Sequence, residues 1–259
     1  MRRLVFTLLL AVPLVACANP PITQWIGGPA AAAGDPYEIS FHFASTFGSG
    51  AAIVNSGTEG DGTAGTTPAC PTWVDVSGDT SAHTSYDGGD MINANYAPTI
   101  SSSASFTVMA WVQSSEYSQT GSFLGGVSGN NEISILYGDG TVSNITTWVV
   151  DSDGTALWTY SSNVKKDTWY HFALTVNRAS PTTGLKTYLN KTQTYVLDIT
   201  ALGEINLSAR SFYVGAINVN GTVSYNWHGK IDSVIIDVEK AWSSTEIGDY
   251  YDDTKAAHP

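Results

Sequence analysis

Basic side chains are scarce in this sequence. The 259 residues include 11 Lys and Arg against 23 Asp and Glu, which gives a formal net charge of −12 at pH 7. Nucleic acids and anionic membrane surfaces are recognised by basic side chains that neutralise their phosphates. The charge balance therefore argues against both as partners, and it is typical of the soluble surface of a secreted protein.

Cysteine and the sequence motifs of hydrolases are also lacking. The two cysteines, Cys17 and Cys70, have no other residues at metal-ligand spacing. A lone cysteine such as Cys70, beside Pro71 and Trp73, is typically a partly buried small hydrophobic residue. The chain contains neither Gly-x-Ser-x-Gly nor His-Glu-x-x-His. Their absence argues against a serine-hydrolase elbow and a zinc-protease helix.

No apolar run near the amino terminus is long enough to span a bilayer stably. Residues 1–16 combine two arginines with the stretch VFTLLLAVPLV, which predicts a secretory signal peptide. The tetrapeptide LVAC at 14–17 resembles the lipobox of bacterial lipoproteins, in which the cysteine is lipidated. The alternative is a small-x-small cleavage site at 16–18 that releases a soluble protein. We favour lipidation of Cys17, which predicts a secreted protein at the bacterial cell envelope or outer surface, touching membrane only through its lipid anchor.

The next residues lack any hydrophobic periodicity. Residues 17–35 contain three prolines and a run of four alanines, which predicts an extended tether after the lipidated cysteine. The length of the remaining chain, 36–255, suits one large all-β domain or two small ones. The order of the motifs described below favours one domain.

Alternation of apolar and polar residues predicts strands through most of 36–255. Trp169–Val176 alternates strictly and returns after a turn as Leu185–Asn190, a long hairpin whose apolar face needs a second sheet. Ser105–Gln113 is apolar on both faces, as central strands are. Asp-Gly turns separate further strands at 132–137, 143–150 and 155–162. The roughly thirty residues after Phe43 are rich in Gly, Ser and Thr and predict a long surface loop.

A helix signal occurs near the carboxyl end. Ser243-Ser-Thr-Glu246 has the spacing of a capping box, followed by Ile247 and a pair of tyrosines as contacts for a short helix. No other helix is expected. The predicted fold class is all-β, a two-sheet antiparallel jelly-roll sandwich with a short C-terminal helix.

Four segments resemble laminin-G-like domains of the concanavalin A type. They occur in that family's order over about residues 37–250: SYDGGDMI (Ser85–Ile92), SFTVMAWVQ (Ser105–Gln113), DTWYHFALTV with LKTYLNKT (Asp167–Thr192), and GKIDSVIID before SSTEI (Gly229–Ile247). The resemblance implies the concanavalin A-like jelly roll. It also implies that His171, within the third segment, is structural, as an imidazole on a sheet commonly hydrogen-bonds a neighbouring backbone.

The resemblance further implies a structural calcium ion. In GKIDSVIID, Asp232 occupies the place where many such domains hold calcium with backbone carbonyls, here those near Ser40 and Gly88. Hard oxygen ligands of this kind suit calcium. The alternative is that Asp232 only caps a strand. The short run Asp151-Ser-Asp153-Gly lacks the remaining ligands of a calcium loop and is interpreted as a turn.

Exposed aromatic residues are the candidate ligand-binding positions. Sugar rings stack on Trp and Tyr, with polar neighbours binding the hydroxyl groups. The candidates are Trp148, Trp158, Tyr160, Tyr225 and Trp227. With the Asp-Ser-Asp-Gly turn, strand parity places Trp148 opposite Leu157 or Thr159, so the two tryptophans are expected to face different ways. Core packing is the alternative use of each ring.

The function predicted is that of a non-catalytic, lectin-like surface lipoprotein module that binds a glycan or glycoconjugate. Glycosidases of this fold place carboxylates in an E-x-D-x-x-E run, and the seven Glu residues here never form one. One alternative is a protein-adhesion or structural module without a sugar site. A second, less favoured, is a glycan-degrading enzyme with an unfamiliar carboxylate pair.

Overall fold

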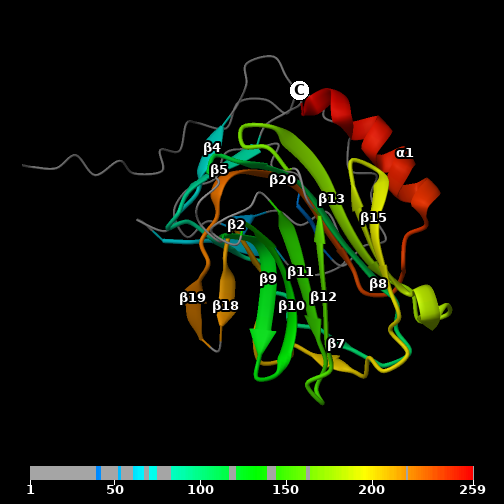
Figure 1. The fold of residues 1–259 in the computed structure, drawn as a ribbon. Coiled ribbons are helices and arrows are strands. Elements are labelled where there is room, and N and C mark those ends of the chain that lie inside the picture. The colour runs from blue at the N-terminus through cyan, green and yellow to red at the C-terminus, as the bar shows by residue number, and fades with distance from the viewer. Residues whose placement is uncertain are drawn as a thin grey trace, which may run out of the picture.

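The structure is a computed structural model that describes residues 39–41, 52–53, 61–66, 70–74, 83–116, 121–138, 144–161, 164–219 and 221–258. The predicted signal peptide (1–16) and the tether with Cys17 (17–35) lie outside the described residues. The described chain forms a sandwich of antiparallel sheets with a single α-helix at its end (Figure 1), which confirms the predicted fold class. That helix is too short and too polar to span a membrane.

One layer of the sandwich is an eight-stranded sheet. Its spatial order is β15 (Thr192–Leu197), β14 (Leu185–Leu189), β13 (Trp169–Val176), β8 (Phe106–Ser114), β20 (His228–Asp237), β5 (His83–Asp87) and β4 (Thr72–Val74), with β1 (Ile39–Phe41) also paired to β20. The predicted hairpin is β13 and β14, joined through the short helix η1 (Pro181–Thr183). The predicted central strand, β8, lies between β13 and β20.

The other layer is a ten-stranded sheet. Its spatial order is β12 (Ala156–Ser161), β11 (Ile145–Val150), β10 (Asn131–Tyr137), β9 (Gly121–Ser128), β17 (Tyr213–Val214), β6 (Ile92–Asn93), β3 (Gly62–Ala64) and β2 (Ala52–Ile53). In addition, β18 (Ile217–Val219) pairs with β9, and β19 (Thr222–Ser224) pairs with β18. A separate pair consists of β7 (Thr99–Ile100) and β16 (Ile205–Asn206). Because β2 and β3 pair within this sheet and Ala64 is buried, the prediction of one long surface loop after Phe43 is wrong for these segments.

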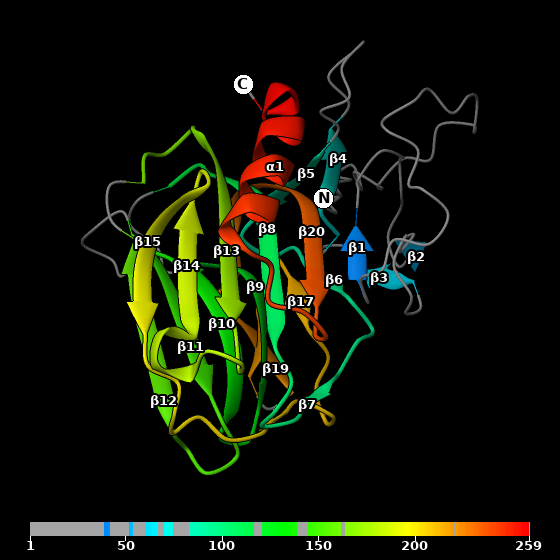
Figure 2. The same ribbon diagram turned by 90° about the vertical axis from the view of Figure 1, so that its right-hand side faces the viewer.

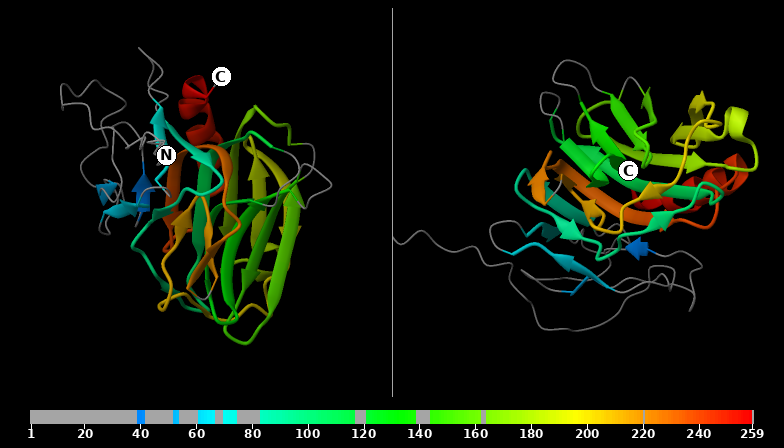
Figure 3. Two further views of the ribbon diagram at one scale, coloured as in Figure 1. Left: turned by 90° about the vertical axis from the view of Figure 1, so that its left-hand side faces the viewer. Right: turned by 90° about the horizontal axis from the view of Figure 1, so that it is seen from below.

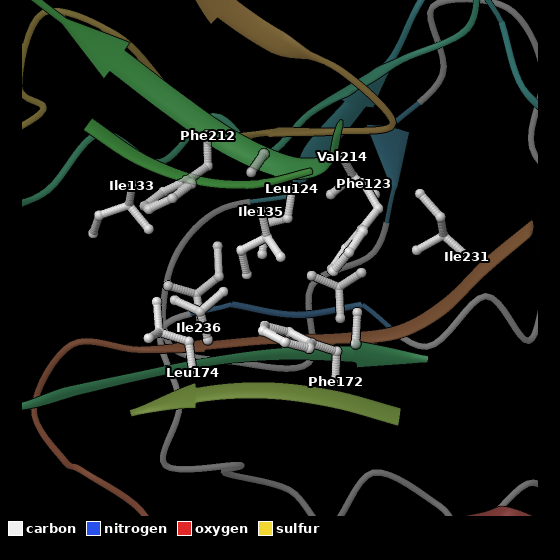
Figure 4. Packing of buried hydrophobic residues seen from close by; sticks show 14 of the residues in the cluster. Phe123, Leu124, Ile133, Ile135, Phe172, Leu174, Phe212, Val214, Ile231 and Ile236 are labelled. Atoms are coloured by element: carbon white, nitrogen blue, oxygen red, sulfur yellow. The ribbon is translucent and has the colours of Figure 1, made fainter. Parts of the chain in front are cut away.

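The main core fills the space between the two layers. Alternate side chains of β8 and β13 meet those of β9 and β10, and Figure 4 shows Phe172 and Leu174 on one layer facing Phe123 and Ile135 on the other. Phe123 and Phe172 pack edge to face with ring centroids 5.9 Å apart. Cys70 is also buried in this cluster, as the sequence predicted.

A second hydrophobic cluster lies on the outer face of the eight-stranded sheet, beneath helix α1 (Ser244–Thr254). The short helix η2 (Lys255–Ala257) follows α1 in the chain. Figure 2 shows α1 crossing in front of β8, and Figure 3 shows it outside the sheets near the marked C-terminus. The predicted capping box is present: the Glu246 amide donates to Ser243 Oγ, and the Ser243 amide donates to Glu246 Oε2. Ile247 is the buried contact of α1.

Candidate functional site

Three exposed aromatic side chains lie together on the outer face of β11 and β12. Along both strands the side chains alternate between core and solvent, and Trp148, Trp158 and Tyr160 point outward with 38%, 53% and 43% of their surface exposed. Trp148 pairs directly with Trp158. The prediction that the two tryptophans face different ways is therefore wrong.

The turn between β11 and β12 explains the difference. Val150 pairs with Ala156, so residues 151–155 form the connection, one residue longer than Asp-Ser-Asp-Gly. Asp151 Oδ1 accepts from the amides of Asp153 (3.0 Å) and Thr155 (2.8 Å), which holds this longer loop closed. Burial by itself would raise the pKa of Asp151, but these amides and that of Gly203 bring it below its ordinary value. Changing the loop by one residue reverses which face a strand presents.

The rings are ordered as a continuous row. The centroids of Trp148 and Trp158 lie 6.4 Å apart with the ring planes at 27°, and those of Trp158 and Tyr160 lie 6.2 Å apart at 24°. Tyr195 continues the row, 5.7 Å from Tyr160 and tilted by 52°. We refer to Trp148, Trp158, Tyr160 and Tyr195 as the aromatic row.

Tyr195 belongs to β15, at the edge of the other sheet, and sequence reasoning missed it. The signal that could have identified it was the alternation of residues in Thr192–Leu197, which indicates a strand that carries Tyr195. Hydroxyl groups join the two edges: Ser161 Oγ of β12 lies 2.9 Å from Thr194 Oγ1 of β15, and Thr194 Oγ1 lies 2.9 Å from Thr187 Oγ1 of β14. These contacts set Tyr195 against Tyr160.

Polar groups flank the Trp148 end of the row. Ser134 of β10 pairs with Trp148 across the ladder, and its hydroxyl donates to Glu132 Oε1. Glu132 is the only carboxylic residue in the sequences of β10, β11, β12 and β15. Ser134 is fully buried and Glu132 is half-buried, so the surface offers stacked ring faces with one carboxylate beside them.

The other two aromatic candidates do not join the row. Trp227 is only 1% exposed, and its ring packs edge to face on Phe123 (5.5 Å) and Tyr137 (5.8 Å), so it belongs to the core and its predicted place on a binding rim is wrong. Tyr225 is 49% exposed, but it follows β19, across β9 and β10 from β11 and β12 (Figure 1).

The residues predicted to bind calcium are spread along β20. Gly88 follows Asp87, which pairs with His228, and a Cβ at Gly88 would overlap the His228 ring. His228 and Asp232 are four residues apart in one strand, roughly 13 Å. Ser40 pairs with Ile235, beyond a bulge. Calcium binding by Asp232 with carbonyls near Ser40 and Gly88 stays a prediction.

Asp232 has protein partners beneath the C-terminal helices. Its Oδ1 accepts from the Ser233 amide (2.7 Å), and its Oδ2 lies 2.9 Å from Nε2 of His258. His258 Nδ1 lies 3.0 Å from the Thr254 carbonyl, so both ring nitrogens have an oxygen partner. Its ring stacks on Trp111 at 4.2 Å. No cluster of three or more His, Cys, Asp or Glu suited to a metal occurs in the described part of the chain.

His171 has the structural location that was expected but not the expected hydrogen bond. The side chain is fully buried on β13 beside Trp111, and neither ring nitrogen has a hydrogen-bond partner among the described residues. Burial, reinforced by the charge of His258, lowers the pKa of His171 to about 3. The imidazole is therefore neutral at physiological pH.

Comparison with known proteins gives a family match and a set of similar folds. The model described as the concanavalin A-like lectin/glucanases superfamily matches residues 86–248. The binding domain of Paraclostridial Mosquitocidal Protein 1 superposes with a TM-score of 0.63 at 15% identity, covering 84% of this chain and 52% of that one. No curated protein matches the chain.

Botulinum neurotoxin domains have the same fold. The serotype G binding domain gives a TM-score of 0.58 at 13% identity, covering 83% of this chain and 50% of that one. The receptor binding domain of botulinum neurotoxin D gives 0.57 at 15% identity, covering 84% and 52%. The chain spans about half the length of these domains. At such identities the likeness concerns the fold alone.

Proposed function

Because this chain belongs to the concanavalin A-like lectin/glucanases superfamily, we propose that it is a non-catalytic, lectin-like module that binds a glycan or glycoconjugate through the aromatic row. The observation that carries the proposal is the direct pairing of Trp148 with Trp158, both exposed and close to parallel. Large exposed rings in a row present the flat apolar faces on which sugar rings stack. The half-buried Glu132, which accepts a hydrogen bond from Ser134, supplies a polar group for sugar hydroxyls at the Trp148 end.

The same surface supports binding more than cleavage. Glycoside hydrolysis by the common mechanisms needs two carboxyl groups about 5–10 Å apart. The strands that carry or flank the row contain one, Glu132, which already accepts a hydrogen bond from Ser134. The solved neighbours are themselves described as binding or receptor binding domains, which is in line with a binding role on this fold.

A retention assay tests the proposal. The purified domain is passed over laminarin, xylan, agar, chitin and alginate, and both retention and new reducing ends are measured. We expect retention on at least one polymer, loss of it in Trp158→Ala, and no new reducing ends. Tyr225→Ala is the matched control, because it also removes an exposed ring but lies apart from the row. Thermal melting of each variant confirms that it is folded.

The other outcomes point to the alternatives. Retention on no polymer would contradict the proposal and favour a protein-adhesion or structural module. New reducing ends would show a glycan-degrading enzyme. Equal loss of retention in Trp158→Ala and Tyr225→Ala would move the binding surface away from the aromatic row.

The proposed place of action is the bacterial cell envelope, reached through a signal peptide over 1–16 and lipidation of Cys17. The support is the sequence pattern LVAC at 14–17. The substitution Cys17→Ser should move the protein from the membrane fraction to the periplasm or medium. A variant that fractionates like the wild type would instead support cleavage after Ala18.

A further inference from the structure

We infer that the ligand of the aromatic row is an extended, uncharged polysaccharide chain that crosses from the ten-stranded sheet to the eight-stranded sheet, with Tyr195 contacting the far end of the chain. This inference rests on the proposed function and adds the class of glycan, its direction and a binding residue. It follows from the continuity of the rings, the contact between the two sheet edges, and the charges around them.

The row is too long for a single sugar unit. Four rings follow one another with neighbouring centroids 5.7–6.4 Å apart. Trp148, Trp158 and Tyr160 differ in plane by less than 30° from one ring to the next, so they present similar faces. Tyr195 tilts by 52°, which turns the surface at the sheet edge. One sugar covers one or two such rings, whereas a chain can contact all four.

The crossing between the sheets is held by hydrogen bonds and not by the rings alone. Thr194, next to Tyr195, lies 2.9 Å from Ser161 and 2.9 Å from Thr187 through its hydroxyl oxygen. Ser161 directly follows Tyr160 in β12. The residues next to both tyrosines are therefore tied together across the sandwich edge. Rings that are already placed lose little conformational entropy when a ligand binds.

The strands that carry the row contain no basic side chain, which argues against an acidic ligand. Recognition of carboxylated or sulfated sugars needs Arg or Lys, and the strands β10, β11, β12 and β15 contain neither. Lys186 of β14 pairs with Val196, so it faces away from Tyr195. The acidic side chain beside the row is Glu132, and the chain as a whole is acidic. An anionic polymer would be repelled, whereas hydroxyl groups can donate to Glu132.

The test compares oligosaccharides of increasing length on wild type and variants. Soluble laminarin, xylan and chitin oligosaccharides of two to six units are titrated by calorimetry, with alginate oligosaccharides as the acidic series. For the neutral series that binds, affinity should rise with length. Tyr195→Ala should weaken the six-unit ligand about fivefold, the scale of one aromatic contact, and leave the two-unit ligand unchanged. Trp158→Ala should weaken both.

Two controls separate ring loss from disruption of the fold. Tyr195→Phe keeps the ring and should bind like the wild type, and Tyr225→Ala removes an exposed ring outside the row. Six-unit binding that is unaffected by Tyr195→Ala but lost in Trp158→Ala would overturn the crossing, and tighter binding of alginate would overturn the uncharged class. Both results would leave the proposed function standing. Absence of binding to every series would contradict the proposed function itself.

Discussion

Acid should destabilise this protein through His171. The imidazole is fully buried between the eight-stranded sheet and the C-terminal helices, with Trp111 at 5.4 Å, Tyr250 at 5.4 Å and Tyr251 at 6.2 Å. These neighbours are aromatic, and the nearby His258 is basic. Burial is the larger cause and His258 the smaller one, and together they lower the pKa of His171 from an ordinary value of 6.5 to about 3. Protonating the folded state is therefore costly.

The sign and size of the effect follow from linkage. The folded pKa lies below the unfolded one, so the unfolded chain binds the proton more readily, and stability falls as the pH drops from about 6.5 toward 3. One pKa unit corresponds to about 1.4 kcal/mol, so between pH 7 and pH 5 the contribution of His171 to the free energy of unfolding should fall by about 2 kcal/mol. Burial raises the pKa of Asp90 to about 6, which shifts stability the opposite way over the same range.

A matched variant isolates the His171 contribution. Free energies of unfolding from urea titrations at pH 5, 6, 7 and 8 are compared for wild type and His171→Phe, which keeps a ring against Trp111. Effects of Asp90 are present in both proteins and cancel in the difference. The wild type should lose about 2 kcal/mol more than the variant between pH 7 and pH 5. Parallel curves, or an NMR titration of His171 in the native state above pH 5, would refute the reasoning.

Three further predictions concern the face beneath α1. Trp111→Ala should lower the free energy of unfolding by about 3–5 kcal/mol in urea titrations. The reason is that the ring is 2% exposed, donates to Thr254 Oγ1 at 2.9 Å and stacks on His258. A loss under about 1 kcal/mol would contradict this packing. Ser243→Ala should cost about 1 kcal/mol in the same assay through loss of the capping box, and an unchanged midpoint would show that the cap contributes nothing. If calcium binds as the family resemblance implies, melting should be higher with calcium than with chelator, and Asp232→Ala should remove the difference. Equal melting temperatures would leave Asp232 with the contacts to Ser233 and His258 alone.

Local chemistry allowed much of the fold to be predicted. Strict alternation in Trp169–Val176 and apolar faces on both sides of Ser105–Gln113 marked the strands that became β13 and β8. Ser243 and Glu246 marked the start of α1 three residues apart. Each of these signals lies within a few residues of chain, so side-chain alternation or a cap is enough to detect it.

The candidate site was only partly readable from the sequence. Trp148, Trp158 and Tyr160 could be named, because aromatic residues at alternate positions of a strand share a face. The pairing of Trp148 with Trp158 could not be predicted, because it depends on a connection of five residues (151–155) that the Asp151 side chain closes with hydrogen bonds. One residue in that loop decides whether the tryptophans stack or face apart.

What the sequence by itself determined is the all-β class, the long hairpin, the helix cap and the acidic, motif-poor character that argues for binding over catalysis. Only the tertiary structure decided that Trp227 is core, because its environment comes from Phe123 and Tyr137 on other strands. Only the tertiary structure, too, placed Tyr195 beside Tyr160, where the edges of two different sheets meet. Burial and contact between distant segments arise when the two layers pack, and they depend on the whole register and not on any local pattern.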